Sequence, residues 1–312
     1  MTTLPLSVRI GIVCVATAAI AALAAFGDQT MLRFASRIAI MGLAAVAVDV
    51  VLGYAGLVSL GHAAFFGLGA YVTGALALMG HTEGLIVWPI AVGTAALAAL
   101  IIGALALRTS GVYFIMITLA FAQMFYYGAN AVPGLGGADG FRLPSRSTLG
   151  GLPLDNPRAF FVLSAFILVA VLLFARRASF AAFGYALQAA RDDDVRSAAS
   201  GIENYRLRLA AFAISGAIAG LAGVLSANLT LYIAPSSVLS WHLSAELLVM
   251  VILGMAGTLY GAVVGAAIFL ALVEVISHYT DFWAMYVGIA VIARVLLIRD
   301  GLLVTLRRLV TA

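Results

Sequence analysis

Residues 53–71, GYAGLVSLGHAAFFGLGAY, decide which kind of fold this chain can adopt. They lie in the run Val50 to Gly80, which has no Asp, Glu, Lys or Arg, yet they include five glycines, a serine and a histidine. The segment is apolar enough to enter a bilayer, but its glycines and polar groups are untypical of a plain lipid-facing helix. Irregular backbone survives in hydrocarbon only where protein or a water-filled cavity satisfies its N–H and C=O groups. The segment therefore predicts the lining of a path through a membrane.

The composition of the whole chain agrees with a membrane location. Of the 312 residues, 64% are hydrophobic and only 10% are charged, whereas soluble domains are about 25% charged. Several charge-free runs reach the roughly 20 residues that a spanning helix needs. The alternating pattern of barrel strands is missing from the sequence. These features predict an all-α polytopic membrane protein.

The basic residues exclude a nucleotide-binding motor in this chain. All 17 are arginine, because the sequence contains no lysine, and a P-loop needs its lysine to contact the phosphates. The net charge of +4 comes from arginines clustered in loops, which indicates membrane topology rather than nucleic-acid binding. A single cysteine and four scattered histidines suggest no metal-ligand cluster or nucleophilic triad. We therefore expect no catalytic residues, cofactor or metal ion.

The distribution of arginine predicts the topology of a single transmembrane domain, residues 1–312. The segment 176–208 contains six arginines, which places it in the cytoplasm by the positive-inside bias. The tail, with Arg299, Arg307 and Arg308, points the same way, so both termini are expected inside, with Met1 to Phe26 retained as a first helix. The Gly- and Pro-rich segment 132–158 becomes the largest external loop. Ten helices are expected, near 8–26, 34–52, 63–79, 85–107, 112–131, 159–175, 209–230, 244–258, 262–277 and 282–298.

The two halves of the chain contain a short repeat. Residues 52–56, LGYAG, return as LGMAG at 253–257, and the second copy again opens a Gly-rich turn. The expected eighth helix, 244–258, contains that copy near its end and is short enough to be a half-helix that turns back. Corresponding Gly-broken segments in two halves of a membrane protein indicate a binding path. The path is therefore assigned to six residues: Gly53, Gly56, Ser59, His62, Gly254 and Gly257.

The polar residues of this path have more than one interpretation. His62 and Ser59 contact either the solute or neighbouring helices, through hydrogen bonds that join the spans. Asp49 and Glu246 each precede one copy of the glycine repeat, and an intramembrane carboxylate is a functional-site hypothesis by default.

The cytoplasmic segment is the second candidate site. Val195, Ala198, Ala199 and Ile202 recur at helical spacing and form one apolar stripe flanked by charge, in a helix broken at Gly201. Such a helix either docks into a groove of a partner protein or lies on its own membrane surface. As the docking element we assign Arg191, Asp192, Asp193, Asp194, Arg196, Ala199, Gly201 and Ile202.

With these residues laid out, the chain resembles the permease subunits of bacterial branched-chain amino-acid ABC importers of the LivM type. The resemblance covers most of the chain from residue 40 onward. The blocks that carry it are GYAGLVSLGHAAFFGLGAY (53–71), RTSGVYFIMITLAFAQM (108–124), GGADG (136–140), FGYALQAARDDDVRSAASGI (183–202), AFAISGAIAGLAGVL (211–225) and LLVMVILGMAGTLYGAVVGA (247–266). The family usually has a second glycine where Met255 stands and prolines near Ala262 and at Asp300.

The resemblance implies an ABC importer permease fold in a bacterial inner membrane. It implies a second, LivH-like permease subunit, two cytoplasmic ATPases that meet the loop 176–208, and a periplasmic amino-acid-binding protein. A copy of this chain is the alternative to the LivH-like subunit. The solute is expected to be a branched-chain or related amino acid, with urea or short amides as the alternative within the family.

A rival function belongs to a different class of transporter. An ion-coupled secondary carrier would use Asp49 or Glu246 as its ion site and would need no ATPase. Uptake by the isolated chain separates the two hypotheses.

Overall fold

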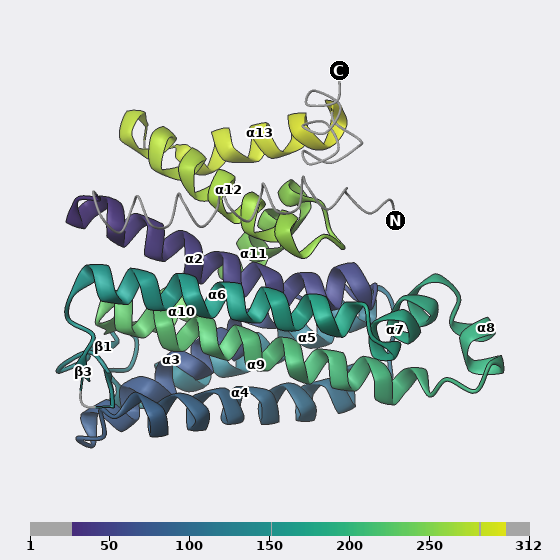
Figure 1. The fold of residues 1–312 in the computed structure, drawn as a ribbon, viewed down its shortest axis with the longest axis horizontal. Coiled ribbons are helices and arrows are strands. Elements are labelled where there is room, and N and C mark those ends of the chain that lie inside the picture. Colours follow the sequence, from purple (N-terminus) through teal and green to yellow (C-terminus); the bar gives the residue numbers. More distant parts are fainter. Residues whose placement is uncertain (1–26, 151, 281, 298–312) are drawn as a thin grey trace.

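The computed structural model describes residues 27–150, 152–280 and 282–297. The helix expected at 8–26 and the arginines of the tail lie outside this range. Most described helices run side by side along one direction (Figure 1), and two-residue strands gather at one end of the bundle, the strand end. The other end, the arginine-rich end, is formed by residues 176–208 and carries two short helices. The architecture is all-α, as the sequence predicts.

Each of the nine spans expected beyond residue 27 corresponds to a helix. The correspondence follows from the charge-free runs, because a helix satisfies all its backbone groups within one segment. The helices that match the expected spans are α2 (Gln29–Asp49), α3 (His62–Leu78), α4 (Gly84–Ala106), α5 (Val112–Asn130), α6 (Pro157–Ser179), α9 (Asn204–Thr230), α11 (Trp241–Gly254), α12 (Leu259–Tyr279) and α13 (Trp283–Leu297). The short helices α7 (Ala182–Asp192), α8 (Asp194–Ala199) and α10 (Pro235–Val238) lie between them.

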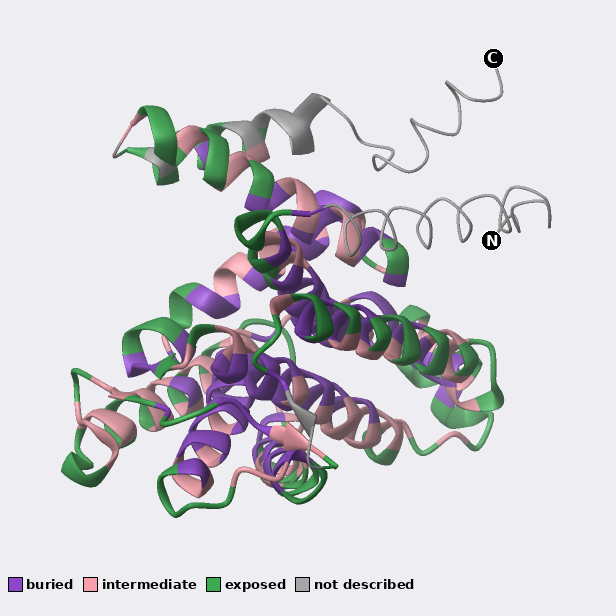
Figure 2. Ribbon diagram, turned by 60° about the vertical axis from the view of Figure 1, so that its left-hand side comes forward, coloured by how far each residue is buried: buried purple, intermediate pink, exposed green. Residues whose placement is uncertain are grey.

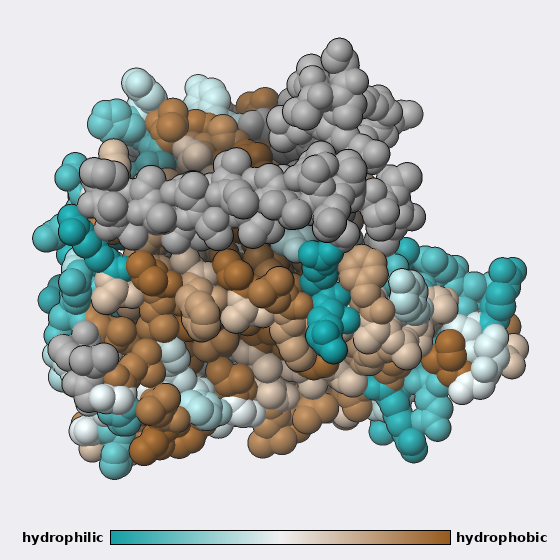
Figure 3. All heavy atoms as spheres, viewed as in Figure 1, coloured by the Kyte–Doolittle hydropathy of each residue, from teal (hydrophilic) through white to brown (hydrophobic). Residues whose placement is uncertain are grey.

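Seven helices in the described part of the chain are long and apolar enough to cross a membrane. On the face shown in Figure 3, hydrophobic residues form a broad middle band, and hydrophilic residues gather at the two ends of the bundle. This is the distribution expected of a multi-pass membrane protein whose helices run along the bilayer normal. The expected total of ten spans includes residues outside the described ranges.

Helices α2 and α9 form the centre of the bundle. α9 packs against α2, α3 and α4, while α2 also packs against α6, α11 and α12. Glycines allow the closest of these approaches, because a Cβ built at Gly223 of α9 would overlap the backbone of Phe66, and one at Gly69 of α3 would overlap Gly220. Small residues at helix contacts are typical of membrane proteins. Figure 2 shows the buried residues on the inward faces of these helices.

The quoted segment is broken between α2 and α3. α2 continues into a π-helical turn, Val50–Tyr54, followed by irregular residues 55–61. α3 then starts at His62 and has only 17 residues, slightly fewer than the roughly 20 of a full span. The non-helical backbone is partly enclosed by protein, since Ala55, Ser59 and Gly61 are buried whereas Gly56 is exposed. This part of the chain has the Gly-broken geometry expected from its sequence.

At the strand end, short antiparallel strands and a hydrogen bond join the segment after α5 to α9 and the residues that follow it. β1 (Phe141–Arg142) pairs antiparallel with β4 (Tyr232–Ile233), and β2 (Thr148–Leu149) pairs with β3 (Leu152–Pro153). The amide of Ser147 donates to Asn228 Oδ1 of α9 at 2.7 Å. The expected external loop 132–158 is therefore an ordered cap over the helix ends.

The arginine-rich end is more helical than the expected boundaries. α6 continues through Arg176 and Arg177 to Ser179, and α9 begins at Asn204, so both helices extend into the segment 176–208. Good helix formers occupy these positions, and arginines in the last turn of α6 interact favourably with its carbonyl end. The connection between the long helices is thus residues 180–203.

Candidate functional site

The two copies of the glycine repeat touch each other at the arginine-rich end. Gly53 lies in the π-helical turn after α2, and Gly257 lies in the turn between α11 and α12. A Cβ built at Gly53 would overlap the backbone N and Cα of Gly257. Gly257 itself has φ +81°, a left-handed conformation that favours glycine. The contact joins the first and second halves of the chain backbone to backbone.

Asp49 ties the same two turns together by a hydrogen bond. Its Oδ1 accepts from the backbone N–H of Gly257 at 2.6 Å, and the residue is fully buried. Its Oδ2 has no hydrogen-bond partner among the described residues. The carboxyl group that sequence reasoning offered as an ion site thus serves as an acceptor that fixes the second glycine turn.

The Asp49 contact gives a first prediction. Asp49→Ala should lower the free energy of unfolding by about 1–3 kcal/mol, because it removes the charged acceptor of the part-buried Gly257 N–H. Asp49→Asn keeps a carbonyl oxygen in place and should remain close to wild type. Thermal unfolding of the purified protein in detergent measures both variants. Equal losses in the two variants would show that the carboxylate charge, rather than its acceptor oxygen, is what matters.

Arg191 connects the cytoplasmic segment to the first glycine turn. It lies in the last turn of α7, and its Nη1 donates to the carbonyl oxygen of Gly53 at 2.6 Å. Its Nε and Nη2 donate to Asp192 Oδ1 at 2.9 and 2.8 Å. The side-chain stem lies over Gly56, where a built Cβ would be 2.5 Å from Arg191 Cγ. Sequence reasoning placed Arg191 in the docking element, whereas in the structure it reaches back to the proposed path.

The rest of the connection is a compact unit built on α9. Asp193 caps α8, since its carboxylate accepts from the Arg196 amide at 2.9 Å, as expected for an N-cap residue. The Asn204 side-chain amide donates to Asp194 Oδ1 at 2.6 Å, and Arg208 pairs with Asp194 at 3.2 Å. α7, α8 and the start of α9 are therefore held together by short polar contacts.

The predicted amphipathic helix is shorter than expected. α8 ends at Ala199, and the chain turns at Gly201, which has φ +84°. The helix ends just before Gly201, where the sequence predicts a break, and the Asp193 cap starts a separate short helix, so Ile202 of the apolar stripe lies beyond the end of α8. The apolar stripe is nevertheless presented outward: Val195 is 80% exposed, Ala198 and Ala199 are exposed, and Ile202 is half-buried.

His62 and Ser59 lie inside the protein rather than on an open surface. The Ser215 hydroxyl donates to the Ala47 carbonyl at 2.6 Å, so it accepts from His62 Nε2, 2.8 Å away. The hydroxyl of Ser59 accepts from the Gly61 amide at 3.2 Å. Both residues are buried. In this conformation His62 joins α3 to α9 and α2, which matches the structural interpretation of its role.

Sequence reasoning assigned Thr118 a structural role but did not identify the other hydroxyl groups that support the broken segment, Ser215 and Ser244. Ser244 of α11 accepts from the Ala63 amide at 2.8 Å, and Thr118 of α5 accepts from the Leu60 amide at 3.3 Å. Ser215 of α9 supports His62 in the same way. Irregular backbone inside a membrane needs such partners. The signal that could have identified them is a single hydroxyl inside an otherwise apolar run, but several spans contain one.

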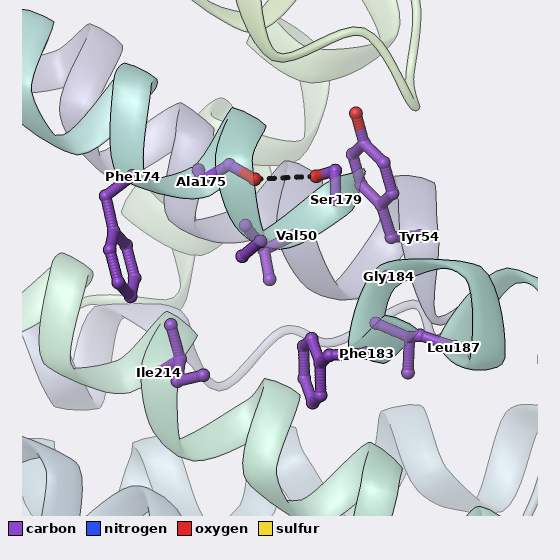
Figure 4. A pocket seen from close by; sticks show the side chains of 10 residues that line it. Val50, Tyr54, Phe174, Ala175, Ser179, Phe183, Gly184, Leu187 and Ile214 are labelled. Atoms are coloured by element: carbon purple, nitrogen blue, oxygen red, sulfur yellow. Dashed lines mark hydrogen bonds between the residues drawn. The ribbon is translucent and has the colours of Figure 1, made fainter. Parts of the chain in front are cut away.

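A small apolar pocket lies beside the contact between α7 and the turn (Figure 4). Its volume is about 20 Å³, and it lies between the π-helical turn, the end of α6, α7 and α9. Phe183 and Leu187 of α7 line it together with Tyr54 of the turn. The Ser179 hydroxyl in its wall donates to the Ala175 carbonyl at 2.7 Å. Next to the pocket, α7 approaches the end of α6 closely, because a Cβ built at Gly184 would overlap the backbone of Ser179.

The other candidate groups stay apart from this site. Glu246 is half-buried on α11 and takes part in no ion pair among the described residues. Within residues 27–150, 152–280 and 282–297, no three His, Cys, Asp or Glu side chains lie close enough together to hold a metal ion. The site consists of two glycine turns, one buried carboxyl group and an arginine that reaches them from the loop.

Comparison with known proteins gives one family and two named relatives. The profile of a family described as "Branched-chain amino acid transport system / permease component" matches residues 30–298. The high-affinity branched-chain amino acid transport system permease protein LivM of Escherichia coli K12 is 29% identical over 267 residues, and that of Salmonella typhimurium LT2 is 28% identical. Each alignment covers 77% of this chain and 62% of the relative, so the chain spans less than two thirds of these relatives. No solved structure matches the chain.

Proposed function

The chain belongs to the family of branched-chain amino acid transport system permease components, and on that basis we propose that it is the transmembrane permease subunit of an ATP-driven importer. The solute is a branched-chain or related amino acid, and the direction is into the cytoplasm. The membrane is the bacterial inner membrane, with the arginine-rich end on the cytoplasmic side. The chain itself carries out no chemical reaction, and ATP is hydrolysed on partner subunits.

The family and the outward-facing loop support this proposal together. The stripe of Val195, Ala198 and Ala199 faces away from the bundle on a six-residue helix that packs on α7 and α9. A soluble partner that covered this stripe would bury it from water. We assign that position to one of the two cytoplasmic ATPases. A LivH-like permease and a periplasmic amino-acid-binding protein complete the importer.

The glycine turns give the proposed path its ability to change shape. Gly53, Gly56, Gly254 and Gly257 lie at a contact between two breaks in the helices, and broken helices that line a cavity are how many transporters bind and release solute. Ser59 and His62 belong to the backbone that follows the first break, and we propose that they reach the path when the turn rearranges.

The docking surface can be tested by co-purification. Val195→Asp combined with Ala199→Asp should lower recovery of the ATPase subunits by about tenfold or more, because unpaired charges at a buried interface cost about 2 kcal/mol or more. The matched control is Val132→Asp, which changes an exposed valine at the strand end and should leave recovery unchanged. Wild-type recovery of the ATPases with the double variant would contradict the proposal that they dock on α8.

The rival function, an ion-coupled carrier, rests on one observation: Asp49 is buried with a free Oδ2 in the described structure. A carrier that binds its ion at Asp49 loses coupling when the carboxylate becomes an amide. The importer proposal expects Asp49→Asn to keep ATP-driven uptake in the assembled complex. Uptake assays with and without an ion gradient separate the two functions.

A further inference from the structure

We infer that Arg191 transmits movement of the α7–α8 connection to the joined glycine turns, acting as a positioning residue for transport. The inference rests on the proposed function, since it assumes that ATPases move this connection. It differs from the proposed docking role of the loop, because it concerns the inward side of α7 and a contact with the transmembrane helices.

The contact replaces a hydrogen bond that the helix cannot make. The last carbonyl groups of a helix lack intrahelical donors, and the π-helical turn after α2 ends at Tyr54. Arg191 Nη1 supplies the donor for Gly53 O at 2.6 Å. Bonds from a charged guanidinium are stronger than neutral ones. Movement of α7 therefore acts directly on the carbonyl at the break in α2.

The surroundings of Arg191 fix its direction. Asp192 Oδ1 accepts from both Nε and Nη2, which holds the planar guanidinium in one orientation. Gly56 has φ +70°, and the missing side chain leaves room for the arginine stem. The remaining donor, Nη1, points to Gly53. A lysine at this position could donate to Gly53 but could not also make the two bonds to Asp192.

The turn that Arg191 holds is also joined to the second half of the chain. Gly53 packs against Gly257, whose amide is bound by Asp49 at 2.6 Å. The closeness of the two backbones means that neither turn can shift far without the other. Arg191 is therefore hydrogen-bonded to the first glycine turn and linked to the second through the contact between Gly53 and Gly257.

Helix α7 also contacts α9, where Arg208 Nη2 donates to the Ala190 carbonyl at 2.8 Å. A small pocket of about 20 Å³, lined mostly by apolar side chains, lies between α7, α6 and the turn. Leu187 is buried at its edge. Among the described residues, Arg191 makes the polar contact between α7 and the π-helical turn. A shift of α7 would therefore reach the turn mainly through this residue.

The test uses the complete importer, purified with its partners and reconstituted, and measures solute uptake per ATP hydrolysed. Arg191→Ala should lower this ratio by about tenfold or more, because it removes a charge-assisted hydrogen bond, while the ATPases still co-purify. Arg191→Lys, which retains one donor, should restore part of the ratio. Arg206→Ala is the matched control, since Arg206 is 80% exposed and pairs only with Glu203 within the described structure.

The outcomes distinguish the role of Arg191 from the importer function on which it rests. An unchanged ratio in Arg191→Ala, with the ATPases bound, would overturn the role of Arg191 and leave the importer proposal standing. An equal fall in the ratio in Arg191→Ala and Arg206→Ala would also overturn the role of Arg191, because removing either arginine would then have the same effect. Failure of the ATPases to co-purify with the wild-type chain would instead contradict the proposed function.

Discussion

Gly53→Leu is expected to abolish transport and to lower the stability of the purified protein. The reason is steric, because a Cβ at this position overlaps the backbone of Gly257 and lies 2.5 Å from Asp49 Oδ1. Backbone atoms cannot rotate away as the end of a flexible side chain can. Overpacking of this kind costs about 1–3 kcal/mol or more, and here it separates the two glycine turns. Reconstituted uptake and thermal unfolding in detergent measure the two effects.

The matched control for this variant is Gly93→Leu. Gly93 also lies in a transmembrane segment, in the middle of α4, but a Cβ built there meets no atom within 4 Å. Leucine at that position faces the surrounding lipid and should leave both uptake and the unfolding midpoint unchanged. Similar behaviour of the two variants would show that Gly53 and Gly257 do not pack as described.

Gly56→Leu is expected to block transport while the partner subunits stay bound. Gly56 has φ +70°, which costs a residue with a Cβ about 1–2 kcal/mol. The leucine would also displace the stem of Arg191, because the built Cβ lies 2.5 Å from Arg191 Cγ. The outward stripe on α8 is untouched by this change. The expected result is a complex of normal composition that hydrolyses ATP with little uptake.

Gly80→Leu separates strain of the backbone from displacement of the arginine. Gly80 has φ +88° but no atom within 4 Å of a built Cβ, so the substitution imposes the same strain without a clash. It should lower stability slightly and keep uptake. If Gly56→Leu transported like wild type, or if Gly80→Leu were equally defective, the arrangement of Gly56 and Arg191 would not explain the effect.

The sequence predicts the helices well because hydrocarbon imposes a simple rule. Backbone groups in a bilayer must be satisfied within one segment, so the spans expected beyond residue 27 correspond to helices, as at α4 and α12. Helix ends near the arginines were predicted less well. Arg176 and Arg177 were taken as loop residues, yet α6 carries them to Ser179, because arginine is a good helix former that also suits a helix C-terminus.

The contacts of the site are less predictable than its residues. The repeat at 52–56 and 253–257 pointed to Gly53 and Gly257, but sequence spacing does not say that the two turns touch. Arg191 looked like one of several loop charges, since its partner is a backbone carbonyl 138 positions away. Such pairings depend on how the helices pack, and no local pattern encodes them.

The central claim is that this chain has no energy source of its own and moves solute only with ATP-hydrolysing partners. The most direct measurement is uptake of a labelled branched-chain amino acid into vesicles that contain either the purified chain alone, under proton and sodium gradients, or the full complex with ATP. We predict uptake only by the full complex with ATP. Gradient-driven accumulation by the chain alone would contradict the account.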